Sequence, residues 1–249
     1  MKINNDFIDK KGFVHPKVLE KAFDGNEKLD FGKFVNETGK KGNSFLGSNG
    51  VYIYQDYDDS SVAYRIYDEY ADYNFNGYND VKIIEEFNKR KDKIKLTKFP
   101  YGVVTVKRCI IGQIIPYFVN SITLMDYIDK NKGINIFRIY RKIIEILKEL
   151  VDNDITYVDV HSKIFLISKD GKINLIDFDD SFLDFSNISS KYESMIHNLV
   201  HMISKCNTSI YGDTYIDNYS QLRDLKDVED KVIQLEKTLS KNLNSRSFK

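Results

Sequence analysis

Apolar and polar residues alternate along the first half of the chain, in short runs separated by turn-forming residues. Glycines at positions 42, 47 and 50 precede the run VYIYQ, which the turn DYDDSS separates from SVAYRIY. Alternation on both sides of a turn predicts two antiparallel strands between residues 39 and 67. Two more strands are expected over 102–106 and 109–117, with a helix over 79–92 before them. The first 120 residues are therefore expected to form mostly sheet with one helix.

The second half of the chain has apolar residues at helical spacing instead. The segment SITLMDYIDK begins at Ser121, a residue type suited to cap a helix, and residues 134–151 carry a long apolar stripe that predicts a buried helix. Two short strands, IFLIS and KINLI, flank the turn KDG and predict a hairpin. Further helices are expected over 192–204 and 220–239. This half is therefore expected to be mostly helical.

Composition argues against several classes of protein. The chain has 249 residues, of which 42% are apolar, enough for one large domain or two closely packed lobes. Its 37 basic and 37 acidic residues leave no net charge to hold nucleic acid or an anionic membrane. Cys109 and Cys206 lie far apart, which argues against a disulfide-stapled or zinc-stabilised scaffold. No stretch has the pattern of a membrane span or signal peptide, so we expect a soluble, cytoplasmic protein.

The candidate chemistry lies in residues 157–181, YVDVHSKIFLISKDGKINLIDFDDS. Asp159 precedes the predicted hairpin and Asp177 follows it. The hairpin folds the chain back, so the two carboxylates can face one site. One carboxylate held in this way can orient or deprotonate a hydroxyl, and the other can bind a metal ion that shields phosphate oxygens.

At these residues the sequence resembles the protein-kinase-like superfamily, including bacterial members with a histidine two residues after the catalytic aspartate. Asp159 matches the catalytic-loop aspartate, His161 matches that histidine, and Asp177-Phe178-Asp179 matches the metal-binding D-F-G motif. Upstream, the run VAYR ending at Arg65 lies where the family has V-A-I-K. The run GSNGVY at 47–52 lies where the phosphate-covering glycine loop and second strand belong. The resemblance covers about residues 39–204.

The resemblance implies a two-lobed, kinase-like α+β fold. It divides the chain into an N-terminal appendage over 1–37, an antiparallel-sheet N-lobe over 38–118 and a compact helical C-lobe over 119–249, with a hinge near Phe118–Ser121. It also implies that ATP and Mg²⁺ bind between the lobes and that the γ-phosphoryl group passes to a hydroxyl of a protein or a small molecule. The expected partners are a nucleotide and a protein, with no nucleic acid and no membrane.

The resemblance implies catalytic roles for three charged residues. Asp159 is expected to orient the acceptor hydroxyl, Asp177 to bind Mg²⁺ and Arg65 to steady the phosphates. Asp80, on the apolar face of the 79–92 helix, is the expected carboxylate partner of Arg65. The other nucleotide-binding candidates are glycines beside the phosphates and apolar side chains around the adenine: Gly47, Gly50, Val51, Ala63, Phe165, Leu166 and Ile176.

Several positions depart from the family pattern. Ile164 stands where the family has a metal-ligating Asn, Arg65 replaces the strand lysine, and Tyr157 replaces the usual His of the catalytic loop. The chain after Asp177 is also shorter than the helical lobe of protein kinases and has no A-P-E signature. These departures favour the alternative, a pseudokinase that acts as a nucleotide-binding or protein-interaction scaffold. The retained Asp159 and Asp177 favour the enzyme, because a scaffold has no evident need for two converging carboxylates.

Two other clusters are expected to be ordinary surface features. Glu193, His197 and His201 recur every fourth residue on one helix, but no H-E-x-x-H core accompanies them. The run KRKDKIKLTK at 89–98 follows a helix end, where cations suit the helix dipole, and has no interleaved aromatic residues. We therefore expect neither a metal clip nor a nucleic-acid interface there. Because an acidic stretch precedes this run, the small lobe is expected to be electrically polarised.

Overall fold

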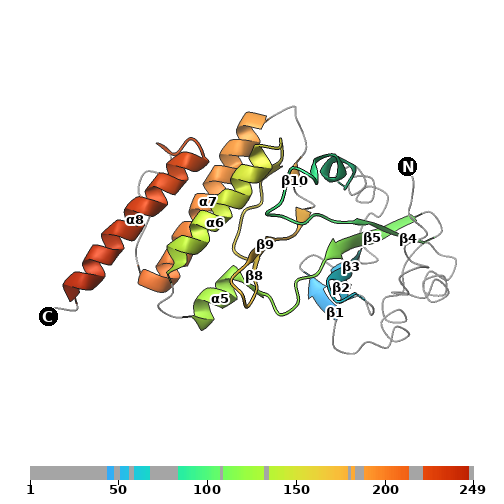
Figure 1. Cartoon of the computed structure of the whole chain (residues 1–249), viewed down its shortest axis with the longest axis horizontal. Helices are drawn as coiled ribbons and strands as arrows, with labels where there is room; N and C mark the ends of the chain where they lie inside the picture. The colour runs from blue at the N-terminus through green and yellow to red at the C-terminus, as the bar shows by residue number, and fades with distance from the viewer. Residues whose placement is uncertain are drawn as a thin grey trace. The chain divides into compact units, whose positions relative to one another are not determined.

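The computed structural model describes residues 44–47, 51–55, 59–67, 84–106, 109–131, 135–178, 181–182, 188–212 and 221–246. The chain divides into two compact units. The first consists of Met1–Lys91 with Lys98–Val119, and the second of Asp92–Thr97 with Asn120–Lys249. Figure 1 labels most of their helices and strands.

A five-stranded antiparallel sheet is the main element of the first unit. Its strands, in sheet order, are β1 (Ser44–Gly47), β2 (Val51–Gln55), β3 (Val62–Tyr67), β5 (Cys109–Pro116) and β4 (Gly102–Val106). The pairings of β2 with β3 and of β4 with β5 confirm the alternating patterns in the sequence. β1 was not expected, because its glycine-rich surroundings indicate a turn more strongly than a strand.

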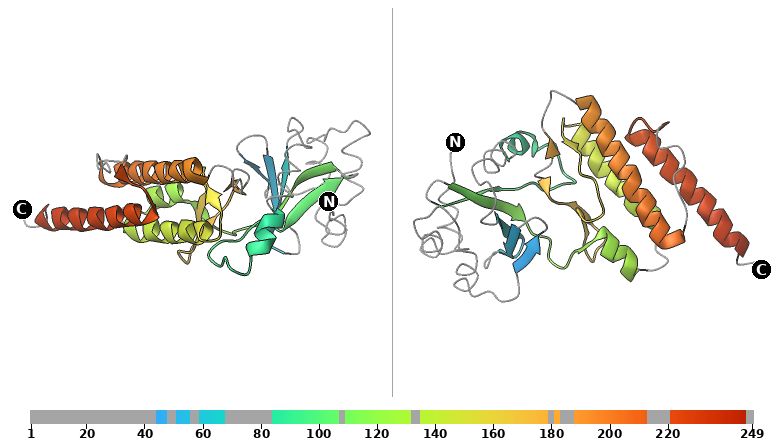
Figure 2. Two further views of the ribbon diagram at one scale, coloured as in Figure 1. Left: turned by 90° about the horizontal axis from the view of Figure 1, so that it is seen from above. Right: turned by 180° about the vertical axis from the view of Figure 1, so that it is seen from behind.

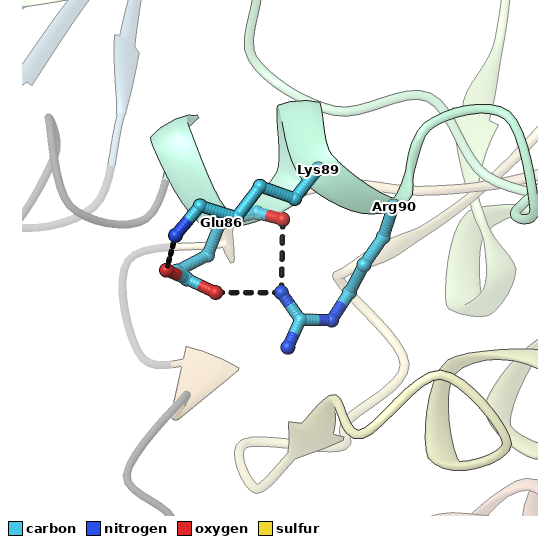
Figure 3. Close-up of polar contacts among 3 residues, drawn as sticks. All are labelled: Glu86, Lys89 and Arg90. Carbon is cyan, nitrogen blue, oxygen red and sulfur yellow. Dashed lines mark hydrogen bonds and ion pairs between the residues drawn. The ribbon is translucent and has the colours of Figure 1, made fainter.

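A helix over residues 84–90 belongs to the same unit. Ile84 and Phe87 are buried, and the ring of Phe87 stacks on that of Phe99 with centroids 4.0 Å apart. Glu86 points away from this apolar face and pairs with Lys89 and Arg90 (Figure 3). The hydrogen bonds from those two cations lower the pKa of Glu86 below its ordinary value.

Small antiparallel sheets occur in the second unit as well. β8 (Phe165–Ile167) and β9 (Ile173–Leu175) form the expected hairpin, whose turn contains Gly171 at a φ of 76°. β6 (Ile122–Thr123) pairs with the other edge of β8, and β7 (Thr156–Tyr157) pairs with β10 (Ser181–Phe182). β6, β7 and β10 have two residues each, too few for a period to show in the sequence.

The helices of the second unit are α5 (Leu124–Lys130), α6 (Ile136–Val151), α7 (Ile188–Tyr211) and α8 (Leu225–Arg246). The expected helix starting with a Ser121 cap is corrected, because Thr123 caps α5 and accepts a hydrogen bond from Asp126 N–H at 3.2 Å. α7 extends beyond the expected 192–204, since no residue interrupts it before Gly212, whose φ is 79°.

α6 is the central helix in the core of the second unit. Its buried residues recur along the whole helix, and α7 and α8 lie alongside it (Figure 2). Tyr140 on α6 donates a hydrogen bond to Asn207 Oδ1 on α7 at 2.9 Å. Val228 and Val232 of α8 are fully buried, and Glu229 pairs with Lys148 of α6. Among the described residues, no helix combines the length and the apolar character that crossing a membrane requires.

Candidate catalytic site

The loop after β7, which contains Asp159, is held in place at several points. The side chain of Asn198 on α7 donates a hydrogen bond to the carbonyl of Val158 at 2.8 Å. Val160 is buried, and Ile164 is buried with its carbonyl accepting from Ile176 N–H at 3.0 Å. The backbone on both sides of Asp159 is therefore fixed by contacts with α7 and with the end of β9.

The carboxylate of Asp159 points to solvent from this fixed loop. Its side chain is 53% exposed, and Oδ2 lies 3.3 Å from Nε2 of His161. Nδ1 of His161 accepts a hydrogen bond from Lys163 N–H at 3.2 Å. Asp159 is thus accessible to a substrate, and the imidazole of His161 lies beside its carboxylate.

Asp177 follows the β8–β9 hairpin in an unusual backbone conformation. Its φ is 66°, in the left-handed region that residues other than glycine seldom adopt. Such a conformation costs on the order of 1 kcal/mol and persists only where the surroundings enforce it. The side chain of Asp177 is exposed, whereas the following Phe178 is buried.

Tyr157 is the side chain that ties Asp177 to the loop of Asp159. Its ring is buried, and its hydroxyl lies 2.6 Å from the carbonyl of Asp177 and 3.1 Å from that of Ile176. The ring also meets Phe178 edge to face, with centroids 5.8 Å apart. In the sequence, Tyr157 is only a departure from the family pattern. Its contact with Asp177 comes from the fold, since a tyrosine hydroxyl usually finds a hydrogen-bond partner once its ring is buried.

Asp177 offers an exposed carboxylate, which is a ligand type that Mg²⁺ takes. Mg²⁺ keeps several waters and needs only one or two carboxylates besides substrate phosphates. Ile164, at the position of the expected second ligand, is 1% exposed and offers no side-chain oxygen. Within the described residues there is no group of three or more His, Cys, Asp or Glu side chains that could hold a metal ion. The role of Asp177 as a Mg²⁺ ligand stays a prediction.

The apolar candidates of the second unit differ in exposure. Phe165 is fully buried, while Leu166 and Ile176 are half-buried. Neighbouring residues of a strand face opposite sides, so Leu166 lies on the opposite face of β8 from Phe165. Leu166 and Ile176 are thus better placed than Phe165 to meet a ligand.

The candidates of the first unit lie on β1, β2 and β3. Gly47 pairs with Val51 where β1 and β2 approach their connection. On β3, Ala63 is fully buried, and Arg65 is half-buried between Ile53 and Gln113 in the sheet register. Gly50 and Asp80 lie outside the described residues. The roles assigned to these residues stay predictions.

The histidines of α7 lie on its exposed side. His197, His201 and Glu193 are all exposed, as expected for a surface helix.

Comparison with known proteins finds likeness among solved structures but not among protein families or curated sequences. No protein-family model matches the sequence, and no curated protein matches it. Among solved structures, the kinase PK-1 of the Cydia pomonella granulovirus is similar to this chain with a TM-score of 0.43 and 14% sequence identity. The likeness covers 56% of this chain and 50% of that kinase. The chain thus matches about half the length of that protein.

Proposed function

We propose that this chain is an ATP-dependent phosphotransferase, which transfers a γ-phosphoryl group to a hydroxyl of a protein or a small molecule. The observation that supports it most is the link through Tyr157, which joins the loop of Asp159 to the backbone of Asp177 while both carboxylates stay exposed. Rigid support beneath two accessible acids is what a reaction with fixed geometry needs. The kinase-like sequence motifs supply the reaction class.

In the proposed reaction, the acceptor hydroxyl oxygen forms a bond to the γ-phosphorus. The bond from that phosphorus to the β–γ bridging oxygen breaks, and ADP leaves with the electron pair. Asp159 orients the hydroxyl and accepts its proton, which then passes to solvent. His161, whose Nε2 lies 3.3 Å from Oδ2 of Asp159, is the proposed neighbour that orients this carboxylate. Asp177 is the proposed ligand of Mg²⁺, which when bound offsets charge on the phosphate oxygens.

Nucleotide binding is tested by thermal unfolding of the full chain with ATP, in the presence and absence of Mg²⁺. A ligand that binds only the folded state raises the melting temperature. We expect Mg²⁺ to enlarge the shift caused by ATP, and Asp177→Asn to remove that enlargement. Asp230→Asn, an exposed aspartate on α8, is the matched control and should behave like the parent. Equal Mg²⁺-dependent shifts in the parent and in Asp177→Asn would contradict the proposal.

A nucleotide-binding pseudokinase is the second candidate function. Buried Ile164 favours it, because the site then lacks the second side-chain ligand that the family uses. The chain would in that case bind ATP and act through contacts with a partner. Measuring phosphate transfer itself separates the two candidates.

A further inference from the structure

Residues 91–98, KDKIKLTK, form a strongly basic segment. Lys91, Lys93, Lys95 and Lys98 are exposed, and the only acid among them is Asp92. None of the four lysine side chains makes an ion pair or hydrogen bond with another residue in the described part of the chain. The preceding Lys89 and Arg90 differ, since both pair with Glu86 (Figure 3). Between residues 89 and 98, the cations without a partner in the described part of the chain are therefore the four lysines of the basic segment.

The backbone of the basic segment is fixed although its lysines are not. Both carboxylate oxygens of Glu149 on α6 accept hydrogen bonds from this backbone, one from Lys95 N–H and one from Leu96 N–H, each at 2.8 Å. Ile94 and Thr97 are buried, with 4% and 6% of their surface exposed. A surface whose backbone is already ordered loses less conformational entropy when it binds.

Leu96 is an exposed apolar side chain within the basic segment. Its side chain is 43% exposed, one of three large hydrophobic residues exposed among the described residues. Lys95 directly precedes it in the sequence, and Lys93 lies three positions before it. A ligand that complements the basic segment must therefore offer both negative charge and an apolar group.

We propose that the basic segment binds an acidic peptide segment of a partner protein, with an apolar residue of that peptide against Leu96. Carboxylates on such a peptide complement the lysines, and a leucine-like side chain removes Leu96 from water. A nucleic acid fits less well, because residues 91–98 contain neither an aromatic ring nor an arginine for bases to stack on. A lipid surface also fits less well, because one exposed leucine is a small apolar anchor. This inference is independent of the proposed phosphotransferase.

The test measures binding of a fluorescent acidic peptide with a central leucine to the full chain by anisotropy. In Lys93→Glu/Lys95→Glu we expect affinity to fall by about tenfold or more, because two attractions become repulsions. Lys205→Glu/Lys226→Glu changes the same charge at exposed positions of α7 and α8 and should bind like the parent. Higher ionic strength should weaken binding of the parent. Thermal unfolding of each variant shows that the fold is retained.

A second variant isolates the apolar contact. Leu96→Ser should weaken binding of the leucine peptide several-fold but leave binding of an otherwise identical peptide with serine in place of leucine unchanged. Three results would overturn the proposal: no measurable binding of the leucine peptide, equal affinity in the Lys93→Glu/Lys95→Glu variant and the parent, or equal effects of Leu96→Ser on both peptides. Tighter binding of a single-stranded oligonucleotide or of anionic vesicles than of the peptide would also overturn it, in favour of that ligand.

Discussion

A single hydroxyl connects the two acidic segments of the candidate site. Tyr157 is buried, and its hydroxyl is close enough to donate to the carbonyls of Asp177 and Ile176. The backbone of Asp177 is in the left-handed region, which aspartate adopts more readily than most residues other than glycine, and the Tyr157 hydroxyl gives its carbonyl a partner. The backbone of the proposed metal ligand is therefore held in part by a side chain of β7.

Tyr157→Phe is expected to destabilise the protein and to disturb nucleotide binding. The ring still packs on Phe178, but the carbonyls of Ile176 and Asp177 lose their donor, which costs on the order of 1–2 kcal/mol. Chemical denaturation measures this loss, and the Mg²⁺-dependent thermal shift with ATP should shrink in the same variant. Tyr127→Phe removes the hydroxyl of a half-buried tyrosine on α5 and is the control. If both variants unfold at the same denaturant concentration, Tyr157 does not support Asp177.

Cys206 is expected to make the stability of the fold depend on pH, and the direction of this dependence can be predicted. Burial raises the pKa of its thiol from an ordinary 9.0 to about 12. Between these values the unfolded chain has lost this proton and the folded chain still holds it. Stability from this group is therefore complete below pH 9 and is lost as pH rises towards 12.

Urea unfolding at pH 8 and pH 10 tests this prediction. The free energy of unfolding should fall between them by about 1.4 kcal/mol more in the parent than in Cys206→Ala, which has no thiol to titrate. Tyrosines that titrate near pH 10 contribute equally to both proteins and cancel in the comparison. Parallel pH profiles for the parent and Cys206→Ala would show that the thiol titrates alike in both states.

At the scale of elements, two kinds of contact attach α8 to α6. Val232 is fully buried in this interface, whereas the ion pair between Lys148 and Glu229 is partly solvated, with 36% and 28% of the side chains exposed. Burial of an apolar side chain stabilises the fold by removing it from water. A partly solvated ion pair stabilises it less, because solvent screens the charges and holding both side chains in place costs conformational entropy. The burial of Val232 is therefore expected to contribute more to stability than the ion pair between Lys148 and Glu229.

Val232→Ala should lower the free energy of unfolding by about 2 kcal/mol, through lost burial and the small cavity left behind. Glu229→Gln, three residues earlier on the same helix, should lower it by less than about 1 kcal/mol. Denaturation curves of the two variants make the comparison directly. A larger effect for Glu229→Gln would mean that the ion pair is less solvated than its exposure indicates.

The elements that the sequence predicts are those long enough to show a period. β2 to β5, the β8–β9 hairpin and α6 all have four or more alternating or helically spaced residues, or a glycine turn that marks them. The two-residue strands and the Thr123 cap are set by tertiary contacts, which a local pattern does not contain. The same limit applies to the site. Asp159 and Asp177 can be found from their motif, but the Tyr157 bond joins residues twenty positions apart.

At the scale of the whole molecule, the chain passes between its two units more than once. Residues 92–97 belong with the second unit although those before and after them belong with the first. Glu149 explains this assignment, since it binds backbone groups more than fifty residues earlier in the sequence. The sequence gives no sign of this contact, because a glutamate that accepts from backbone N–H groups looks like any other helical surface acid.

Phosphate transfer is a property of the whole molecule, and measuring it distinguishes an enzyme from a scaffold. In an enzyme, Asp159→Asn should lower phosphate incorporation into candidate proteins and small-molecule alcohols by about 10² to 10⁴-fold, because Asn cannot accept the proton of the hydroxyl. ATP binding should change little, since Asp159 acts on the acceptor rather than on the nucleotide. Asp154→Asn, at another exposed aspartate, is the control for lost charge.

Restoring the expected metal-ligating Asn with Ile164→Asn is not expected to give a clear test of catalysis. Ile164 is 1% exposed, so Ile164→Asn buries an amide in an apolar core and should cost about 1–3 kcal/mol of stability. Loss of activity in that variant would therefore be ambiguous, whereas Asp159→Asn alters an exposed side chain and leaves the core intact. The radiolabel assay is run under conditions where the thermal shift shows that ATP is bound. If the parent then incorporates no more phosphate than Asp159→Asn, the site binds nucleotide without transferring it, and the chain is a scaffold.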